Sequence, residues 1–262
     1  MKRIILTLFT LAITFTSASG WGREGHEIIA KIADNNLRPT VRKKIESYLG
    51  QSIVYYAKWM DDYRHTPEYG FTTRWHAVHV NEDLKYTPHP LPEGDAVYGL
   101  TYATDTLKNY RNLPDSTVSV NIKYILHIVG DMHCPGHIKY QGIQQEYNVH
   151  FGGPISYIQP DIDTRMHFVW DKYAIQSCRI WSVSEYAEEL DRKSRREIKA
   201  MIDGDYVDWV QDNAARCLIQ FELSHPGDTL QEDFVNAAMP FIETQMLYAG
   251  YRLAHVLNSI FK

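Results

Sequence analysis

Histidine and aspartate stand four residues apart at three places in this sequence, namely His79 with Asp83, His127 with Asp131, and His167 with Asp171. On a helix, residues at this spacing share one face, and both side chains are zinc ligands, so each pair has the geometry to hold one cation. The spacing also arises readily by chance, and it more often produces a surface hydrogen bond or a helix cap. The pairs therefore raise metal chemistry as a hypothesis without deciding it.

The composition is that of a folded globular protein. The 262 residues are 44% hydrophobic and 13% aromatic, which is enough to bury a full core and excludes a disordered, collagen-like or coiled-coil chain. The net charge is −5 and the pI is near 6.2, so no bulk basic surface recruits nucleic acid, and any phosphate binding must be local. The twelve histidines are unusual, because imidazole is the commonest metal ligand.

The N-terminal residues 1–20 have the pattern of a secretory signal peptide. A basic start, Lys2-Arg3, precedes an apolar run from Ile4 to Phe15, and small residues follow up to Gly20. The apolar run is shorter than the roughly 20 residues that a membrane-spanning helix needs. We expect cleavage between Gly20 and Trp21, and a secreted or periplasmic protein that is not embedded in a membrane.

The remainder, residues 21–262, shows no repeat, linker or break in composition, so we expect one domain. Helical periodicity dominates and predicts a mainly α fold, with a long C-terminal helical pattern from Phe234 in which Pro240 is a candidate kink. The strongest strand candidate is Trp75 to Asn81, which would form a small β element. The proline-rich stretch from Tyr86 to Gly99 reads as a surface loop.

Two of the His/Asp pairs fall on predicted helices. A helix that begins near Asp115 or Ser116 carries the second pair and ends by Cys134, because the following proline cannot continue it. A shorter helix that begins from Asp163 or Thr164 carries the third pair. The helical spacing argument therefore applies to both of these pairs.

The cysteines allow at most one internal disulfide. The chain has three, Cys134, Cys178 and Cys217, and an exported protein meets oxidising conditions. We expect Cys178 to pair with Cys217.

A set of motifs points to a function more specifically than the His/Asp pairs do. The string Gly130-Asp131-Met132-His133-Cys134-Pro135-Gly136-His137 follows an apolar helical segment and ends in a turn. It is accompanied, in order along the chain, by Trp21-Gly22-x-x-Gly25-His26, Trp59-Met60-Asp61-x-x-Arg64, Trp75-His76 and Met166-His167-Phe168-Val169-Trp170-Asp171. Together these motifs resemble the S1/P1 nuclease family from Trp21 to about Tyr173. The resemblance implies a mainly helical fold similar to that of the bacterial zinc phospholipases C, with three zinc ions in a cleft.

The resemblance also implies which residues hold each zinc. The first ion would be bound by Asp61, His76, His127 and Asp131. The second would be bound by His137, His167 and Asp171. The third would be bound by Trp21, His26 and the bridging Asp131. Cleavage at Gly20 fits this set, because a freed α-amine and the carbonyl oxygen of Trp21 can close a chelate ring that an uncleaved chain cannot form.

Taken singly, these residues have simpler interpretations. Asp61 lies beside Asp62 and reads as a solvated helix residue, while His76 reads as a core histidine and His26 as a surface residue near a helix start. The joint order of the motifs outweighs these alternatives. Arg64 is a candidate contact for substrate phosphate, with a surface ion pair as its alternative. The pattern leaves His65, His79, His133 and His150 without a role.

The expected reaction is hydrolysis of a phosphodiester by an activated water. Asp61 would orient or deprotonate the water, and the other zinc-binding side chains would hold the cations that neutralise the phosphoryl oxygens. The expected substrate is single-stranded DNA, RNA or a nucleotide, cut to 5′-phosphorylated products, with 3′-nucleotidase activity as a further expectation. No obligate protein partner is indicated.

The sequence differs from the family pattern at positions where many relatives contact the bases of the substrate. Ala77 and His79 stand where many relatives have an aromatic residue and then Asp or Asn. Gly152-Gly153-Pro154 replaces a glycine-glycine-asparagine, and Arg165-Met166 replaces an asparagine-leucine. Phosphodiester hydrolysis is therefore better indicated than specificity for nucleic acid. The alternatives are a phospholipase C-like phosphoesterase, against which Asp171 argues because the phospholipases use Glu there, and a metal-binding module without catalysis.

Overall fold

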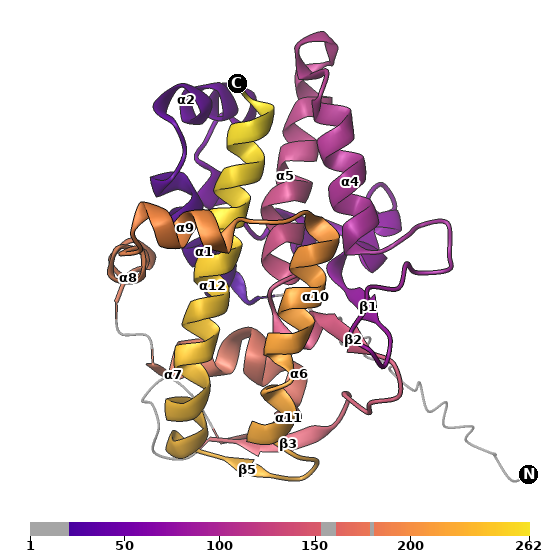
Figure 1. Cartoon of the computed structure of the whole chain (residues 1–262), viewed down its shortest axis with the longest axis vertical. Coiled ribbons are helices and arrows are strands. Elements are labelled where there is room, and N and C mark those ends of the chain that lie inside the picture. Colours follow the sequence, from indigo (N-terminus) through magenta and orange to yellow (C-terminus); the bar gives the residue numbers. More distant parts are fainter. Residues whose placement is uncertain (1–20, 153–160, 179–180) are drawn as a thin grey trace, which may run out of the picture.

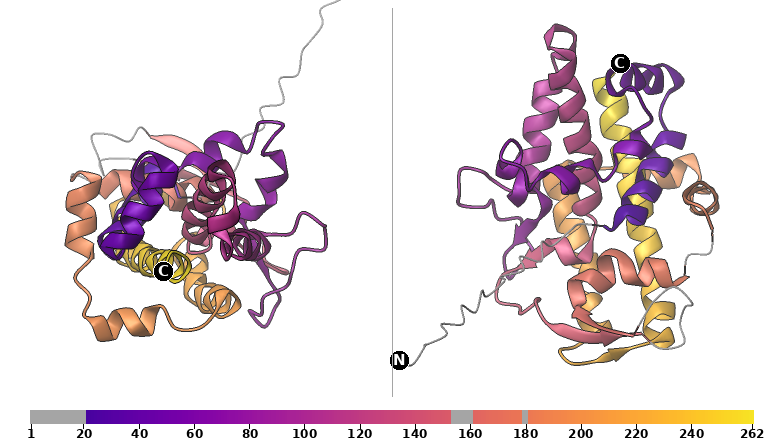
Figure 2. Two further views of the ribbon diagram at one scale, coloured as in Figure 1. Left: turned by 90° about the horizontal axis from the view of Figure 1, so that it is seen from above. Right: turned by 180° about the vertical axis from the view of Figure 1, so that it is seen from behind.

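Long helices form the frame of the protein. The computed structural model describes residues 21–152, 161–178 and 181–262. In Figure 1, α12 (Glu232–Ile260) runs along the length of the molecule, and it packs against both α1 (Arg23–Asn35) and α5 (Asp115–Asp131). The right-hand view of Figure 2 shows α5 side by side with α4 (Ala96–Leu107), which projects with it from the body of the molecule. The mainly α fold that the sequence predicts is confirmed.

Shorter helical segments fill the space around this frame. They are α2 (Pro39–Leu49), η1 (Ile53–Tyr56), α3 (Trp59–Tyr63), η2 (Gly70–His76), η3 (Tyr110–Asn112), η4 (Pro135–His137), α6 (Met166–Phe168), η5 (Val169–Tyr173), α7 (Ala174–Cys178), α8 (Val183–Leu190), α9 (Arg195–Met201), α10 (Tyr206–Cys217) and α11 (Gln220–Leu223). The segments η1 to η4 are 3-10 turns and η5 is a π-helical turn. Among the described helices, none is long and apolar enough to cross a membrane.

In the described part of the chain, the strands form two small sheets. In the first, β1 (Val78–Val80) pairs in parallel with β2 (Ile138–Tyr140), and His79 lies opposite Lys139. In the second, β3 (Asn148–Phe151) lies between the antiparallel β4 (Ile162–Arg165) and the parallel β5 (Thr229–Leu230). The first sheet matters for the site, because a zinc-ligand candidate stands just before each of its strands.

The helix α5 is buried along most of its last two turns. Ile122, Ile125 and Val129 are fully buried, as the helical spacing predicts, and so are the polar His127 and Asp131. The helix begins at Asp115 as expected but ends at Asp131, three residues earlier than the expected limit. Residues 132–134 form a turn instead, with the Cys134 backbone N–H bonded to the Asp131 carbonyl, which redirects the chain into η4.

Several other predicted boundaries are wrong. Residues 162–165 form the strand β4, and the helix with the third His/Asp pair begins only at Met166, because the polar segment pairs with β3 instead of winding. Of the expected strand Trp75 to Asn81, only Val78–Val80 is extended, and the preceding residues belong to η2. The expected loop up to Gly99 ends at Asp95, whose carboxylate accepts hydrogen bonds from the Val97 and Tyr98 N–H groups and starts α4.

The expected disulfide between Cys178 and Cys217 is absent. All three cysteines are free, and each sulfur has another contact. The Cys178 thiol donates to the Ala174 carbonyl within its own helix, whereas Cys217 on α10 lies buried beside Gln245 of α12. Helix α12 also continues through Pro240. The predicted signal peptide, residues 153–154 and their Gly-Pro motif lie outside the described residues.

Candidate metal centre

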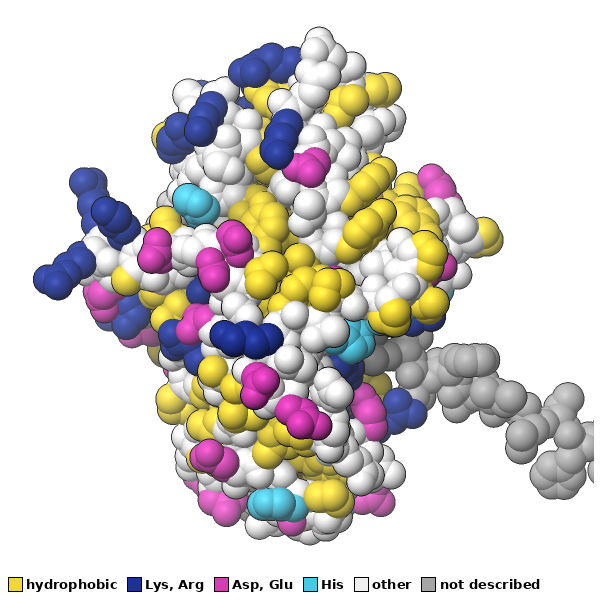
Figure 3. Space-filling model, turned by 45° about the vertical axis from the view of Figure 1, so that its right-hand side comes forward, with side chains coloured by type: hydrophobic (Ala, Val, Ile, Leu, Met, Phe, Trp, Pro, Cys, Tyr) yellow, Lys and Arg dark blue, Asp and Glu magenta, His cyan; other side chains and the backbone are white. Residues whose placement is uncertain are grey.

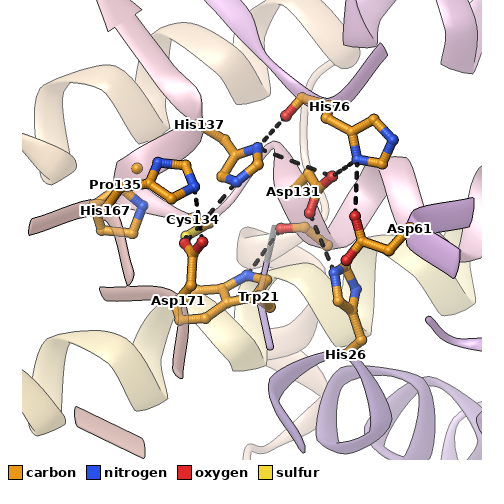
Figure 4. Close-up of polar contacts among 12 residues, drawn as sticks. Trp21, His26, Asp61, His76, Asp131, Cys134, Pro135, His137, His167 and Asp171 are labelled. Carbon is orange, nitrogen blue, oxygen red and sulfur yellow. Dashed lines mark hydrogen bonds and ion pairs between the residues drawn. The ribbon is translucent and has the colours of Figure 1, made fainter. Parts of the chain in front are cut away.

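The zinc-ligand candidates of the sequence gather in one buried region. They come from separate elements, with His26 on α1, Asp61 on α3, His76 at the end of η2, His127 and Asp131 on α5, His137 at the end of η4, His167 on α6 and Asp171 on η5. Each of these side chains belongs to a residue that is at most 6% exposed. Figure 4 labels all of them except His127 and shows the labelled side chains pointing toward one another from opposite sides of the site. Histidines and carboxylates buried together in this way require either strong pairing or cations.

Asp131 lies at the middle of the larger cluster. Its Oδ1 is 3.2 Å from His26 Nε2, and its Oδ2 is 2.8 Å from His76 Nδ1 and 3.2 Å from His127 Nε2. Asp61 Oδ1 lies 3.7 Å from the same two nitrogens of His76 and His127. One carboxylate thus contacts three imidazoles.

Asp171 organises the second cluster. Its Oδ2 is 2.8 Å from His167 Nε2, and its Oδ1 is 3.9 Å from His137 Nε2. The other nitrogen of the His137 ring lies 4.0 Å from Asp131 Oδ2, so this histidine stands between the clusters. The π-helical geometry of η5 still brings His167 and Asp171 together, as the spacing of four predicts for a helix. The pair His79 and Asp83 is different, because His79 lies on β1 and the two share no helix.

Backbone carbonyls fix the orientation of two imidazoles. His127 Nδ1 lies 3.0 Å from the Ala57 carbonyl, and His137 Nδ1 contacts the His76 carbonyl. A carbonyl oxygen only accepts, so each Nδ1 must donate its proton and each Nε2 faces a carboxylate with its lone pair in the neutral form. Both rings are thereby prepared to bind a cation through Nε2.

Two glycines of the central motif make room for the ligands. A Cβ on Gly130 would lie 2.9 Å from His26 Nδ1, and a Cβ on Gly136 would lie 2.9 Å from His167 Nδ1. Any larger residue would displace these rings. The glycines in the string from Gly130 to His137 are therefore explained by the close approach of α1 and α6.

Trp21 is anchored beside the site. It is fully buried, and its indole Nε1 donates a hydrogen bond of 2.9 Å to the Gly130 carbonyl. The next residue, Gly22, donates its N–H to the Asp171 carbonyl at 2.7 Å. These bonds hold the start of the described chain against both clusters, as Figure 4 shows.

The charges of the cluster shift the pKa values in opposite directions. Burial lowers the pKa of the His127 imidazole, but the carboxylates of Asp131 and Asp61 outweigh it and raise the pKa to about 10. His137 behaves in the same way and reaches about 9, mainly through Asp131. His76 is dominated by burial, which lowers its pKa to about 4. The pKa of Asp131 is held well below its usual range, because the cationic histidines outweigh the cost of burying its charge.

Arg64 lies inside the protein rather than on its surface. Its side chain is 4% exposed, and its Nη2 lies 3.5 Å from Asp61 Oδ1. The alternative of a surface ion pair is therefore wrong. The ion pair exists, but it is buried and belongs to the site.

Sequence reasoning missed one residue at the centre. Cys134 Sγ donates to Asp171 Oδ1 at 3.1 Å, and burial together with the Asp171 charge raises the pKa of the thiol well above its usual value. The thiol therefore acts as a donor that positions Asp171. Its place in the motif, three residues after Asp131, was the available signal.

The structure shows the surroundings of the histidines to which the family pattern gives no role. His133 is fully buried, and its ring nitrogens are bonded to groups other than the zinc-ligand candidates, with Nδ1 donating to the Val129 carbonyl and Nε2 accepting from Arg252 Nη1 at 2.8 Å. It ties the end of α5 to α12. His150 pairs with Asp163 at the surface, and His65 is exposed.

The comparison with known proteins agrees with this geometry. The family model described as S1/P1 Nuclease matches residues 21–262. The chain belongs to the S1/P1 nuclease family. The family resemblance predicted from the motifs is thus confirmed, and with it the assignment to the zinc-dependent hydrolases that act on ester bonds.

Relatives align with this S1/P1 family member over almost their whole length. Endonuclease 2 of Arabidopsis thaliana is 22% identical and covers 98% of the chain and 97% of the relative. Nuclease S1 of Aspergillus oryzae is 23% identical, with 92% of each chain covered. Nuclease P1 of Penicillium citrinum is 23% identical over 92% of this chain and 97% of its own.

The donor set fits zinc. Among the residues that the structure describes, three groups have ligand atoms that all lie within 4.8 Å of one another, namely His26 with Asp61 and His127, His76 with His127 and Asp131, and Cys134 with His137 and Asp171. Tetrahedral ligands about 2.0 to 2.1 Å from a zinc ion are about 3.4 Å apart, close to the separations around Asp131. Within the described part of the chain, no hydrogen bond of normal geometry reaches either oxygen of Asp61 or Oδ1 of Asp131. Buried carboxylate oxygens without such bonds are suited to a cation.

Proposed function

We propose that this protein is a secreted nuclease with three zinc ions, which hydrolyses single-stranded DNA or RNA to 5′-phosphorylated nucleotides. The observation that carries the proposal is the contact of the single carboxylate of Asp131 with His26, His76 and His127 in a chain that belongs to the S1/P1 family. Removal of a terminal 3′-phosphate is part of the proposed activity.

Two of the proposed zinc ions lie in the cluster around Asp131 and one lies in the cluster around Asp171. The first zinc is held by Asp61, His76, His127 and Asp131. The second is held by His137, His167 and Asp171. The third is held by Trp21, His26 and Asp131. Bound zinc would supply Lewis acidity to the phosphoryl oxygens and lower the pKa of water toward about 7.

Asp61 orients the attacking water in this proposal. Its pKa lies below its usual range because His127 and His76 outweigh the effect of burial, so the carboxylate is ionised at neutral pH and accepts hydrogen bonds. Arg64, paired with it at 3.5 Å, keeps the carboxylate in place and brings a guanidinium within reach of a phosphoryl oxygen. In this proposal the Asp61 carboxylate and the Arg64 guanidinium therefore both lie beside the bound substrate.

Exposed aromatic side chains support the preference for single strands. Tyr63 on α3 is 44% exposed and Phe71 on η2 is 49% exposed, and both belong to elements that carry zinc-ligand candidates. An unpaired base can stack on such a ring, whereas a paired base is already stacked. On the face seen in Figure 3, hydrophobic side chains form a band across the middle, and basic groups are interspersed with acidic ones.

Cleavage assays with zinc-loaded protein whose N-terminus is Trp21 test the proposal. The protein is expected to bind three zinc ions by elemental analysis, to cut single-stranded DNA and RNA faster than duplex DNA, and to lose activity in a chelator. Turnover of lecithin but of no oligonucleotide, at acidic and neutral pH, would instead establish the phospholipase-like alternative. Retention of zinc without release of phosphate or cleavage of any diester would identify a binding module.

The same proposal requires processing of the N-terminus. N-terminal sequencing of protein exported from an expressing cell is expected to begin at Trp21. A Gly20-extended protein is expected to bind one zinc ion fewer, because its residue 21 has no free amine. Equal zinc content in the two forms would contradict the third ligand set.

A further inference from the structure

A second polar cleft lies beside the metal centre. It has a volume of about 570 Å³ and is lined by Phe71, Arg74, His79, His89, Glu93 and Lys139, among others. Pockets of this size take nucleotide-sized ligands. None of these residues belongs to the proposed zinc ligands, so the cleft requires its own explanation.

The first sheet connects the cleft to the centre. Strand β1 begins two residues after His76 and strand β2 begins one residue after His137. The parallel register places His79 opposite Lys139, and the flanking residues of both strands are buried, so these two side chains share the outer face. At about 3.3 Å per residue, they stand about 7 to 10 Å along the strands from the two histidines. A substrate at the centre is therefore within reach of the cleft.

The cleft has one cation that no carboxylate of the described residues neutralises. Arg74 is exposed and lies 3.4 Å from His89 Nε2, and among the described residues it has no carboxylate ion-pair partner. Lys139 Nζ donates to the Gly136 carbonyl and to Glu146 Oε1, each at 3.0 Å, so its charge is partly balanced by a half-exposed acid. Glu93 is the acidic residue of the wall. Arg74 thus supplies the cation with the most freedom to bind a ligand.

Imidazoles complete the polar wall. The rings of His79 and His89 lie 5.1 Å apart, and His79 Nδ1 is buried without a hydrogen-bond partner. The Leu91 N–H donates to His89 Nδ1, so the neutral His89 ring carries its proton on Nε2, beside Arg74. This N–H adds to the guanidinium fork, whose planar donors match phosphate oxygens. The exposed ring of Phe71 at the same cleft offers a stacking face for a base.

We propose that this cleft is a phosphate subsite, in which Arg74 and Lys139, with donors from His79 and His89, hold a second phosphate group of the substrate whose scissile ester lies at the metal centre. The inference rests on the proposed function and specifies its substrate class, namely nucleotide chains that carry at least two phosphates. A dinucleotide with a single internal phosphate would leave the subsite empty.

Matched dinucleotides test the subsite through activity. The zinc-loaded protein is assayed on a dinucleotide with one internal phosphodiester and on the same dinucleotide with an added 5′- or 3′-terminal phosphate. We expect kcat/KM to be about tenfold higher with the added phosphate at one of the two ends, mainly through KM. Arg74→Gln should reduce that ratio to near one, whereas Arg196→Gln on the exposed side of α9 should preserve it. A ratio near one in the wild type, or an unchanged ratio in Arg74→Gln, overturns the proposal.

Salt dependence and NMR distinguish phosphate binding by Arg74 from a purely structural role of this residue, because a structural role would change neither measurement. On a longer single strand, Arg74→Gln should reduce the slope of log affinity against log salt by about one phosphate contact. Inorganic phosphate added to the zinc-loaded protein should shift the imidazole signals of His79 and His89 in the wild type and in Arg196→Gln but not in Arg74→Gln. This titration distinguishes the two proposals, because it does not require cleavage. Absence of any shift in the wild type contradicts the subsite even if the protein is an active nuclease.

Discussion

Gly130 of α5 faces the imidazole of His26 on α1 so closely that a Cβ at position 130 would lie 2.9 Å from Nδ1. The same glycine accepts the indole N–H of Trp21 through its carbonyl. Two of the three proposed ligands of the third zinc are thus located by one residue that itself has no side chain.

Gly130→Ala should weaken the third zinc site. In an ordinary helix the change would stabilise the protein by up to about 1 kcal/mol, but here the added methyl group pushes the buried His26 ring away from Asp131. We expect the zinc content to fall from three to two after dialysis, measured by elemental analysis. Ser116→Ala, on the exposed first turn of the same helix, is the control. Full retention of zinc by Gly130→Ala would show that the ring has space to move.

Asp61→Asn should inactivate the protein, whereas Asp62→Asn should not. The two carboxylates are adjacent, but Asp61 is buried among His76, His127 and Arg64, while Asp62 is exposed and pairs with Lys58. Loss of the water-orienting carboxylate is expected to lower kcat at least about 100-fold. Circular dichroism should confirm that both variants are folded. Equal activity of the two variants argues against any role of Asp61 in catalysis.

Zinc binding should release protons at pH 7. In the metal-free protein the pKa of His127 is about 10 and that of His137 about 9, so both imidazoles carry a proton that a bound ion must displace. Isothermal titration calorimetry in buffers of different ionisation enthalpy should therefore give buffer-dependent heats that correspond to about two protons per chain. Heats that are identical in all buffers contradict this charge state.

The metal-free protein should be most stable near pH 6.5. His127 and His137 have folded pKa values above the ordinary histidine value of about 6.5, so their stabilising effect is complete below that pH and is lost as the pH rises toward 9 to 10. His76 has a folded pKa of about 4, so its contribution is lost as the pH falls from about 6.5 toward 4. Thermal melting in a chelator across this range measures the profile. A melting temperature that rises steadily up to pH 9 would be inconsistent with it.

The thiols should be unreactive in the native protein. Burial raises the pKa of Cys134 and Cys217 well above the usual value, and it raises that of Cys178 to about 11. Since the thiolate is the reacting form, a disulfide-exchange reagent at pH 8 should label native protein slowly and unfolded protein at all three cysteines. Detection of only one thiol after unfolding would restore the expected disulfide.

The sequence predicts the ligand set better than the elements that carry it. His127 and Asp131 could be paired from helical spacing alone, because α5 is long and its apolar periodicity is regular. Asp61 could not, since nothing local distinguishes it from Asp62, and only the order of the motifs pointed to it. Burial of the first and exposure of the second depend on how α3 packs against α5, which is a tertiary property.

The wrong element boundary, the wrong disulfide and the overlooked cleft all depend on contacts between residues distant in the sequence. The strand β4, Ile162–Arg165, has a largely polar sequence and is extended because it pairs with β3. A prediction from the residues of β4 and their sequence neighbours cannot detect that pairing. The expected disulfide failed for the same reason, because Cys217 faces Gln245 of α12 and no spacing rule reveals that neighbour. The cleft around Arg74 was also invisible, since His79 and Lys139 are 60 residues apart and meet only through the parallel pairing of β1 and β2.

Inward-facing and outward-facing side chains alternate along β1 and β2, so substitutions at the two kinds of position have different consequences. Val78, Val80, Ile138 and Tyr140 point inward and keep the ladder that begins beside His76 and His137 in register. Substitutions at the outward positions 79 and 139 leave that ladder intact. A lineage of such hydrolases can therefore change what it accepts by replacing a few surface-facing residues, while inheriting its reaction chemistry unaltered.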